Sequence, residues 1–307
     1  MNLLHLKYAV EIAKTGSMSK AAESMFMNQS NLSRAIKELE DNLGIVIFNR
    51  TAQGISLTPQ GDEFLSYANG ILRQVEEVEA LYTGSVKGKQ RFSVSVPRAS
   101  YIAAAFVEFC KHIDKERPVE IFYKETNALR AIDNILKSDY KLGIIRYQQM
   151  FDERFKSMLT KKGLNCELLC EFRYIAVMAK SNPLSNKDDL QFSDLAGFIE
   201  IAHADPYVPS LPLSKVREEE YIENIDKRIF VFERGSQFDL LQNVPNTFML
   251  VSPIPQETLD KYELAEIPCI SEKRVYRDML IYSKGYKLSE LDKRFITEVT
   301  KAKRQYL

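Results

Sequence analysis

Residues 29–43 combine an apolar stripe with a polar face that carries two cations. The apolar residues recur every three or four positions, as on the buried face of an α-helix: Leu32, Ile36, Leu39 and Leu43. A second face of the same helix holds hydroxyl and basic side chains: Ser30, Ser33, Arg34 and Lys37. Arginine donors bind phosphate oxygens or base edges in the major groove of DNA. The pattern predicts a helix that lies against DNA; the alternative is a surface helix with a merely solvated polar face.

The segment before this helix places it in a helix-turn-helix. Residues 19–25 predict a short helix in which Ala21 and Ala22 permit the close approach of another helix. A turn of three or four residues, from Phe26 to Gln29, then leads into the helix with the polar face. This connection length is typical of DNA-binding helix-turn-helix motifs.

A pair of short strands follows the polar-faced helix. After Gly44, the runs 45–50 and 54–57 predict two strands around a polar tip, which together form a wing. Arg50 stands beside that tip, from where a long basic side chain can reach a phosphate or the minor groove. The elements that position the candidate side chains therefore predict a winged helix-turn-helix.

The stretch from Leu6 to Gly61 resembles the winged helix-turn-helix of LysR-type transcriptional regulators. The matching stretches, with x for any residue, are Ala21-Ala22, Gln29-Ser30-x-Leu32-Ser33-Arg34-x-Ile36-x-x-Leu39-Glu40-x-x-Leu43-Gly44, Phe48-x-Arg50 and Leu57-Thr58-Pro59-x-Gly61. The resemblance implies double-stranded DNA as a partner. It implies that six residues lie on the DNA side: Gln29, Ser30, Ser33, Arg34, Lys37 and Arg50. Asn31 stands where the family often has alanine, and we expect it to add a specific contact.

A long helix follows the wing. From Pro59, a residue suited to the first turn of a helix, the pattern continues to about Tyr82 without another proline. Its apolar residues alternate at spacings of four and three, which is a heptad seam: Phe64, Ala68, Ile71, Val75, Val78 and Tyr82. The seam predicts a dimer, and the alternative is that the stripe packs on its own domain. The resemblance also implies dimerisation through this helix and, in many members, tetramers.

After residue 90 the residue pattern changes: runs rich in β-forming residues alternate with helical patterns. Runs 91–96, 119–125 and 142–147 predict strands, with helical patterns between them. Such alternation is typical of parallel strands with helices on the faces of the sheet. Residues 166–265 contain strands and helices of their own, and the C-terminal segment 266–307 returns to the first group. The second domain is therefore predicted to have two lobes with a cleft between them, as in periplasmic binding proteins.

Polar residues follow three of the predicted strands. Ser100, Thr126 and Asn127 stand at helix starts, and Arg146 ends the third strand. Small ligands bind beyond the carboxyl ends of parallel strands, where helix N-termini offer free N–H groups. These four residues are the predicted effector site, and Arg146 hints at an anionic effector. The alternatives are simple helix capping for the first three residues and an ordinary surface position for the arginine.

The rest of the second domain lacks residue patterns for catalysis. The three histidines are not at metal-ligand spacing, and neither a phosphate-binding glycine loop nor a serine-nucleophile motif occurs. We therefore expect no catalytic residue, no metal and no cofactor. Cys166 and Cys170 are four residues apart in a predicted strand and are expected on the same face, as buried apolar residues or as a thiol switch.

The net charge and the length of the apolar runs limit the classes of protein to which the chain can belong. The 307 residues contain 42 basic and 42 acidic residues, so the formal net charge is zero, and residues 1–90 contain nine basic and ten acidic residues. Nucleic-acid binding must then come from the placement of a few cations rather than from a basic domain. No apolar run approaches a membrane span and no signal peptide is recognisable, which indicates a cytoplasmic protein.

These observations predict an α+β multidomain protein. Its parts are a winged helix-turn-helix at 1–60, a linker and dimerisation helix at 61–83, a hinge at 84–90 and an effector domain at 91–307. Within the effector domain, lobe I is 91–165 with 266–307, and lobe II is 166–265. The predicted function is transcriptional regulation by an operator-bound dimer or tetramer that responds to a small molecule and, as an activator, contacts RNA polymerase. The alternative is a cytosolic small-molecule-binding α/β protein or enzyme with a helical dimerisation appendage.

Overall fold

The computed structural model describes residues 2–51, 54–82, 89–138 and 140–307. They form two compact units, the first made mainly of residues 1–88 and the second containing most of residues 89–307. The hinge predicted at 84–90 falls almost entirely outside the described residues. Among the described helices, none is long and apolar enough to cross a membrane.

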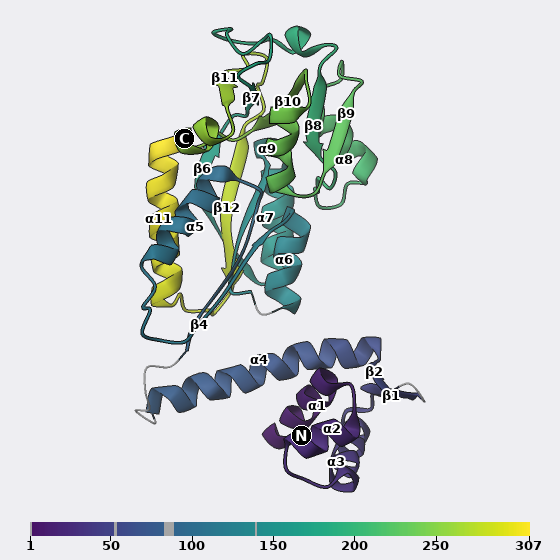
Figure 1. Ribbon diagram of the computed structural model, residues 1–307. Coiled ribbons are helices and arrows are strands. Elements are labelled where there is room, and N and C mark those ends of the chain that lie inside the picture. The colour runs from purple at the N-terminus through teal and green to yellow at the C-terminus, as the bar shows by residue number, and fades with distance from the viewer. Residues whose placement is uncertain (1, 52–53, 83–88, 139) are drawn as a thin grey trace. The chain divides into compact units, whose positions relative to one another are not determined.

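The first unit consists of three short helices, a two-stranded wing and a long helix (Figure 1). Its elements are α1 (Leu3–Thr15), α2 (Met18–Ser24), α3 (Gln29–Leu43), β1 (Phe48–Thr51), β2 (Gly54–Leu57) and α4 (Pro59–Tyr82). The side chains of Asn2 and Ser17 accept hydrogen bonds from backbone N–H groups and so cap α1 and α2. Gly16 and Gly44 end α1 and α3 in the left-handed conformation. The predicted helix-turn-helix and wing are confirmed.

The core of the first unit lies under α3. Leu32, Ile36 and Leu39 are fully buried there, and they pack with Ala21 of α2. Leu43 belongs to the same predicted stripe but is 36% exposed, because it is the last residue of the helix. The apolar stripe of α3 is therefore the buried face as predicted, except at its end.

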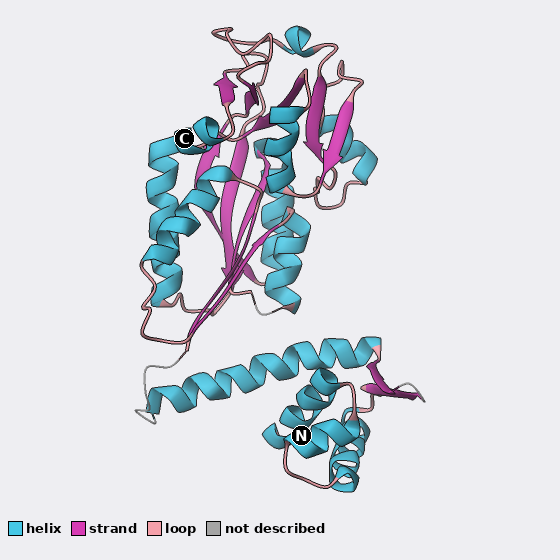
Figure 2. Cartoon of the chain, viewed as in Figure 1, coloured by secondary structure: helices cyan, strands magenta, loops and turns pink. Residues whose placement is uncertain are grey.

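The second unit contains two five-stranded sheets, which Figure 2 shows in magenta. The first sheet, in the order β4-β3-β5-β12-β6, is built from β3 (Gln90–Val96), β4 (Val119–Glu125), β5 (Leu142–Gln148), β6 (Leu164–Phe172) and β12 (Tyr276–Ser283). The second, in the order β11-β7-β10-β8-β9, is built from β7 (Ile175–Ala179), β8 (Ile199–His203), β9 (Arg228–Val231), β10 (Thr247–Val251) and β11 (Leu264–Ile267). Strand β3 pairs in parallel with β4 and β5, which confirms the predicted β-α-β alternation.

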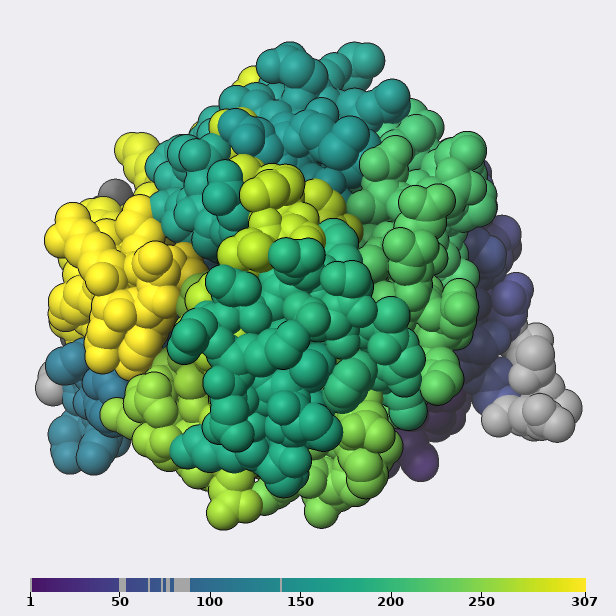
Figure 3. Space-filling model, turned by 90° about the horizontal axis from the view of Figure 1, so that it is seen from above, coloured from purple at the N-terminus to yellow at the C-terminus, as the bar shows by residue number. Residues whose placement is uncertain are grey.

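Helices cover both faces of the first sheet. The helices of this unit are α5 (Ser100–Lys111), α6 (Ala128–Lys137), α7 (Asp152–Lys161), α8 (Leu213–Glu220), α9 (Arg234–Asn243), α10 (Gln256–Lys261) and α11 (Glu290–Tyr306), with the short 3-10 helices η1 (Gln149–Phe151) and η2 (Phe192–Leu195). One core joins the sheet to α5 and α11, and another joins its opposite face to α6 and α7. Figure 3 looks down on the second unit and shows α11, in yellow, on its outer surface.

The border between the lobes differs from the prediction. Residues 166–172 lie in β6, which pairs with β12 in the first sheet, although the sequence placed them in lobe II. The chain leaves the first sheet after Phe172 and enters the second sheet at Ile175. We call the first sheet with its helices the first lobe, and the second sheet with its helices the second lobe.

An irregularity in β6 changes the position of the two cysteines. Asp278 pairs with Cys170 while the next residue of β12 pairs with Leu168, so one extra residue of β6 is inserted between these pairs. Such a bulge reverses the alternation of side chains. Cys166 therefore packs in the core on the α6 face and Cys170 in the core on the α5 face. The prediction that they share a face is wrong, and burial raises the pKa of each thiol to about 11.

Candidate functional site

The polar face of α3 is open. Gln29, Ser30, Asn31, Arg34 and Lys37 are all exposed on it. Within the part of the chain that the structure describes, neither Arg34 nor Lys37 forms an ion pair. Two cations without internal partners remain available to an external anion such as a DNA phosphate.

Two of the predicted residues on this face make contacts within the first unit. Ser33 is half-buried, in keeping with a position beside the buried stripe. The amide oxygen of Gln29 accepts a hydrogen bond of 3.0 Å from the hydroxyl of Ser19 in α2. That bond ties the first turn of α3 to the preceding helix, so it fixes the orientation of the two helices of the motif.

An acidic residue of α3 is turned away from the polar face by the wing. The carboxylate of Glu40 accepts hydrogen bonds from the backbone N–H groups of Ile47, at 2.7 Å, and Phe48, at 3.1 Å. Its charge is thus used to hold the start of β1. The strand pairs β2 in antiparallel register, with Arg50 opposite Ile55. The side chain of Arg50, a predicted DNA contact, lies outside the described residues.

The apolar stripe of α4 divides into two parts. Ala68 is fully buried and Phe64 half-buried against the core of their own unit, where α4 contacts α1. Further along the helix, Ile71 is 37% and Val78 54% exposed, with the half-buried Val75 between them. The side chain of Tyr82 lies outside the described residues. The stripe therefore packs on its own unit at its start and is uncovered afterwards.

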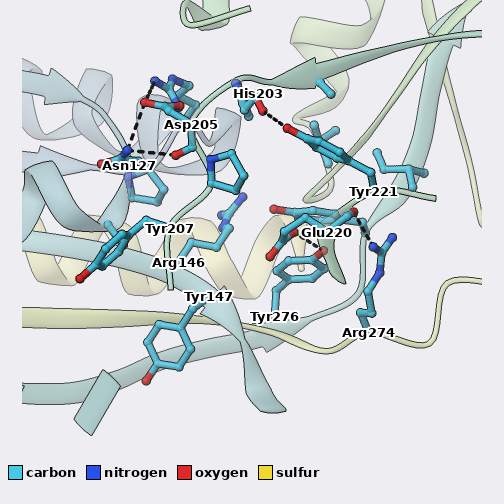
Figure 4. A pocket seen from close by; sticks show the side chains of 18 of the residues that line it. Asn127, Arg146, Tyr147, His203, Asp205, Tyr207, Glu220, Tyr221, Arg274 and Tyr276 are labelled. Carbon is cyan, nitrogen blue, oxygen red and sulfur yellow. Dashed lines mark hydrogen bonds and ion pairs between the residues drawn. The ribbon is translucent and has the colours of Figure 1, made fainter. Parts of the chain in front are cut away.

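A cavity of about 150 Å³ lies between the two lobes of the second unit (Figure 4). The first lobe contributes residues that follow the ends of β3 and β4 and residues near the end of β5, as the parallel strands predict. Thr126, Asn127 and Arg146 line it. Ser100 does not, because it is buried in the first turn of α5. Three of the four predicted effector residues are thus brought together.

Asp205 of the second lobe joins the lobes at one end of the cavity. Its carboxylate accepts two hydrogen bonds from the Arg98 guanidinium, at 2.9 and 3.3 Å, and one from the side-chain amide of Asn127 at 3.2 Å. The amide oxygen of Asn127 accepts from the N–H of Arg130 and so also caps α6. Asn127 therefore has both roles considered for it, as a cap and as a cavity residue.

Arg146 forms an ion pair within the protein. Its guanidinium donates to both oxygens of Asp278, at 2.8 and 2.7 Å, and lies 4.6 Å from the ring centre of Phe172. Burial opposes the positive charge, but Asp278 outweighs that effect, and the pKa of Arg146 is raised well above its usual value. The sequence predicts a cation open to an anionic ligand, whereas the structure shows one already paired.

The other half of the cavity is acidic and aromatic. Glu200 pairs with Arg228 at 2.8 Å, and Glu220 accepts a hydrogen bond of 3.1 Å from the hydroxyl of Tyr276. The Tyr276 ring stacks on that of Tyr174, with 3.8 Å between the ring centres. These residues come from segments that the sequence analysis did not connect, because nothing in their local patterns indicates that they meet.

A buried histidine also lines the cavity. Burial, together with the nearby Arg98 guanidinium, lowers the pKa of His203 to about 3. The imidazole is therefore neutral at physiological pH. Its Nδ1 atom has no hydrogen-bond partner within the described residues. In the same part of the chain, no cluster of three or more metal-ligating side chains occurs.

Two curated proteins are similar to this chain over more than half of its length. The chain is 26% identical over 200 residues to the HTH-type transcriptional regulator AlsR of Bacillus subtilis, a match that covers 64% of this chain and 62% of that protein. It is 28% identical over 257 residues to the HTH-type transcriptional regulator YofA of Bacillus velezensis, covering 76% of this chain and 87% of that protein. The match to AlsR thus spans less than two thirds of that relative.

A solved structure matches the whole fold. Full-length CbnR complexed with its target DNA has a TM-score of 0.59 at 16% identity, over 98% of this chain and all of that one. At this identity the match shows the fold alone. Residues 3–62 match the family described as bacterial regulatory helix-turn-helix protein, lysR family. With this domain in front of an α/β unit of two sheets, the chain is similar to LysR-type transcriptional regulators.

Proposed function

We propose that the protein regulates transcription by binding double-stranded DNA through α3 and the wing, and that a small molecule in the cavity between the lobes controls this binding. The observation that carries the proposal is the open face of α3, with Arg34 and Lys37 free of internal partners in the described chain. Exposed cations on a helix that protrudes from a helix-turn-helix suit the phosphates and base edges of a major groove. Because its proposed target is DNA, we propose that it acts in the cytoplasm.

Two features support control by a small molecule. The cavity lies between two lobes that Asp205 ties together through Arg98 and Asn127. A ligand that favours one arrangement of the lobes shifts the population of that arrangement by its differential affinity. Coupling of this shift to α3 changes DNA affinity or operator geometry. In an activator, the same shift would alter a contact with RNA polymerase.

Substitution on the polar face of α3 tests the DNA-binding part. We expect Arg34→Ala to weaken binding to a duplex selected by the wild-type protein by roughly 5- to 150-fold, the equivalent of about 1–3 kcal/mol for a base contact. Lys37→Ala should weaken it more evenly across sequences and reduce the salt slope by about one. Fluorescence anisotropy at several salt concentrations measures both effects.

The matched control removes a cation elsewhere in the same unit. Lys14 lies on α1 and its side chain is 76% exposed, with only a weak pair to Glu11 at 3.9 Å. Lys14→Ala changes the net charge by the same amount and should leave affinity within twofold. Equal losses in all three variants would mean that only the net charge matters, and would contradict recognition by α3.

The uncovered stripe of α4 supports assembly as a dimer, and tetramers could form from such dimers. We expect Ile71→Asp and Val75→Asp to break the dimer, because each buries a charge in an apolar seam. Sedimentation velocity should show the monomer, and operator binding should fall with it. Asn69→Asp adds the same charge on the exposed opposite side of α4 and should leave the dimer intact. Unchanged sedimentation of both seam variants would refute this interface.

A further inference from the structure

The charged residues around the cavity are almost all paired with one another. Arg98 pairs with Asp205, Arg146 with Asp278, and Arg274 with Glu272. Glu200 pairs with Arg228. Every residue of the cavity wall is described, and among its charged members Glu220 alone has no ion pair.

The cation Arg274 acts on Glu220 only through its charge, because its ion pair is with Glu272. The guanidinium of Arg274 donates to both carboxylate oxygens of Glu272 through Nε and Nη2. Its Nη1 donates to the backbone carbonyls of Glu219 and Glu220, at 3.2 and 2.5 Å. Arg274 is thus held by Glu272 and by the backbone, and within the described residues the carboxylate of Glu220 receives hydrogen bonds from two neutral groups, the Tyr276 hydroxyl and the Gln148 side chain.

An enclosed carboxylate that has hydrogen bonds from two neutral groups and no ion pair is poorly satisfied. A carboxylate accepts about four hydrogen bonds, and burial without a counter-charge is unfavourable. Burial raises the pKa of Glu220, and the nearby Arg274 charge and the hydrogen bonds from Gln148 and Tyr276 only partly offset this. The wall of the cavity therefore presents one unmatched negative charge to whatever enters it.

Aromatic rings surround the same end of the cavity. Tyr174, Tyr221 and Tyr276 all line it, and Figure 4 shows Tyr276 and Tyr221 on either side of Glu220. The ring faces of tyrosine attract cations, an effect that strengthens when water is excluded. A carboxylate among tyrosine rings is a suitable environment for an organic cation and an unfavourable one for an anion.

We infer that the ligand of this cavity carries a positively charged nitrogen group, such as an amidinium, guanidinium or ammonium, which pairs with Glu220. The inference rests on the proposed control by a small molecule and adds the chemical class of that molecule. It replaces the anionic ligand that Arg146 suggested, because that arginine is occupied by Asp278.

The cavity volume sets the size of a suitable probe. At about 150 Å³, it corresponds to roughly one benzene-sized ring. Benzamidine, benzamide and benzoate share one skeleton and carry a positive, zero and negative charge at neutral pH. We expect the full-length protein to bind benzamidine at least tenfold more tightly than benzamide or benzoate, as measured by isothermal titration calorimetry.

Variants of Glu220 assign this preference to its carboxylate. Glu220→Gln keeps the shape and a hydrogen-bond acceptor but removes the charge, and it should abolish the preference for benzamidine. Glu220→Asp keeps the charge and should restore part of that preference. Glu219→Gln is the matched control, since Glu219 is exposed on the same helix and does not line the cavity.

Three results would overturn the assignment of a cationic ligand. They are no binding of benzamidine, equal or tighter binding of benzoate, and a preference for benzamidine that persists in Glu220→Gln. Operator affinity of the wild-type protein, measured without any probe, keeps the two proposals separate. If DNA binding through Arg34 holds while benzamidine fails, the ligand class is wrong and the DNA-binding proposal stands.

Discussion

The polar face of α3 and the cavity between the lobes both contain arginines. The arginine on α3 is open to solvent, whereas those at the cavity form ion pairs within the protein. Arg34 on α3 is exposed and unpaired within the described residues, whereas Arg98, Arg146 and Arg274 at the cavity each hold a carboxylate of the protein. Water and salt stabilise an exposed cation until a phosphate replaces them. An enclosed cation has no water or salt around it and needs a carboxylate of the protein to balance its charge.

The difference shows where specificity can arise in each region. On α3, every exposed donor is available, so affinity grows with the number of contacts and falls with salt. In the cavity, the other charged side chains are held in ion pairs. Recognition of a ligand therefore depends on Glu220, which has no ion pair. Three substitutions test this comparison.

The largest expected effect on stability comes from breaking the buried ion pair between Arg146 and Asp278. Asp278 is fully buried and holds Arg146 at 2.7 and 2.8 Å. We expect Asp278→Ala to destabilise the second unit by about 3–5 kcal/mol, because it leaves a buried, unpaired guanidinium. Urea denaturation with segment-resolved hydrogen exchange would show faster exchange in β5 and β12, while α3 stays protected.

An exposed pair provides the control for that change. Lys180 and Asp260 are 3.3 Å apart, with side chains more than half exposed. Asp260→Ala should change stability little, because water replaces the lost partner. A similar loss in both variants would mean that pairing at the cavity has no special structural importance.

A smaller effect is expected from a steric contact in the first unit. A Cβ atom on Gly61, in the first turn of α4, would lie 2.1 Å from the carbonyl oxygen of Ile47. Gly61→Ala should destabilise the first unit by about 3 kcal/mol, because backbone atoms must move. DNA binding should fall, while benzamidine binding stays unchanged.

The control for this substitution lies in the same helix. A Cβ atom on Gly70 meets nothing within 4 Å, so Gly70→Ala should stabilise α4 by up to about 1 kcal/mol through helix propensity. Thermal denaturation of both variants, followed by circular dichroism, measures the contrast. Destabilisation by Gly70→Ala would mean that α4 makes contacts that this unit alone does not show.

The smallest expected effect is a dependence of stability on pH. His203 has a pKa of about 3 in the folded protein, against about 6.5 in an unfolded chain. As the pH falls through 6.5, the unfolded state takes up a proton and the folded state does not, so stability falls. Between pH 7 and pH 5 this loss amounts to about 2 kcal/mol.

A variant that does not titrate isolates this contribution. His203→Gln should lose less stability than the wild type over the same pH interval, as measured by urea denaturation of the full chain. Carboxylates are common to both proteins and cancel in the comparison. Parallel pH profiles of the two proteins would show that the imidazole is not kept neutral by its surroundings.

Local periodicity was enough to predict the first unit. The spacing of Leu32, Ile36 and Leu39 determined which face of α3 is buried, and hence that Arg34 and Lys37 lie outside. The helical period is a property of neighbouring residues, so such predictions need no knowledge of distant segments. The same reasoning predicted the alternation of β3, β4 and β5 with helices.

The sequence alone did not predict which distant residues meet. Arg146 and Asp278 are 132 positions apart, and their pairing follows from β12 entering the sheet beside β5. The bulge in β6 is equally non-local, because it exists only in register with β12 and decides the faces of Cys166 and Cys170. The alternation of residues along β6 does not by itself indicate where the bulge lies.

The helices, the faces they bury and the open cations of α3 thus follow from local sequence patterns. The ion pair of Arg146 and the lack of one at Glu220 are visible only in the folded chain, since an ion pair depends on the positions of two chain segments in space. Helical faces arise from each residue's own neighbours, whereas charge balance in a cavity arises from how the lobes close around it.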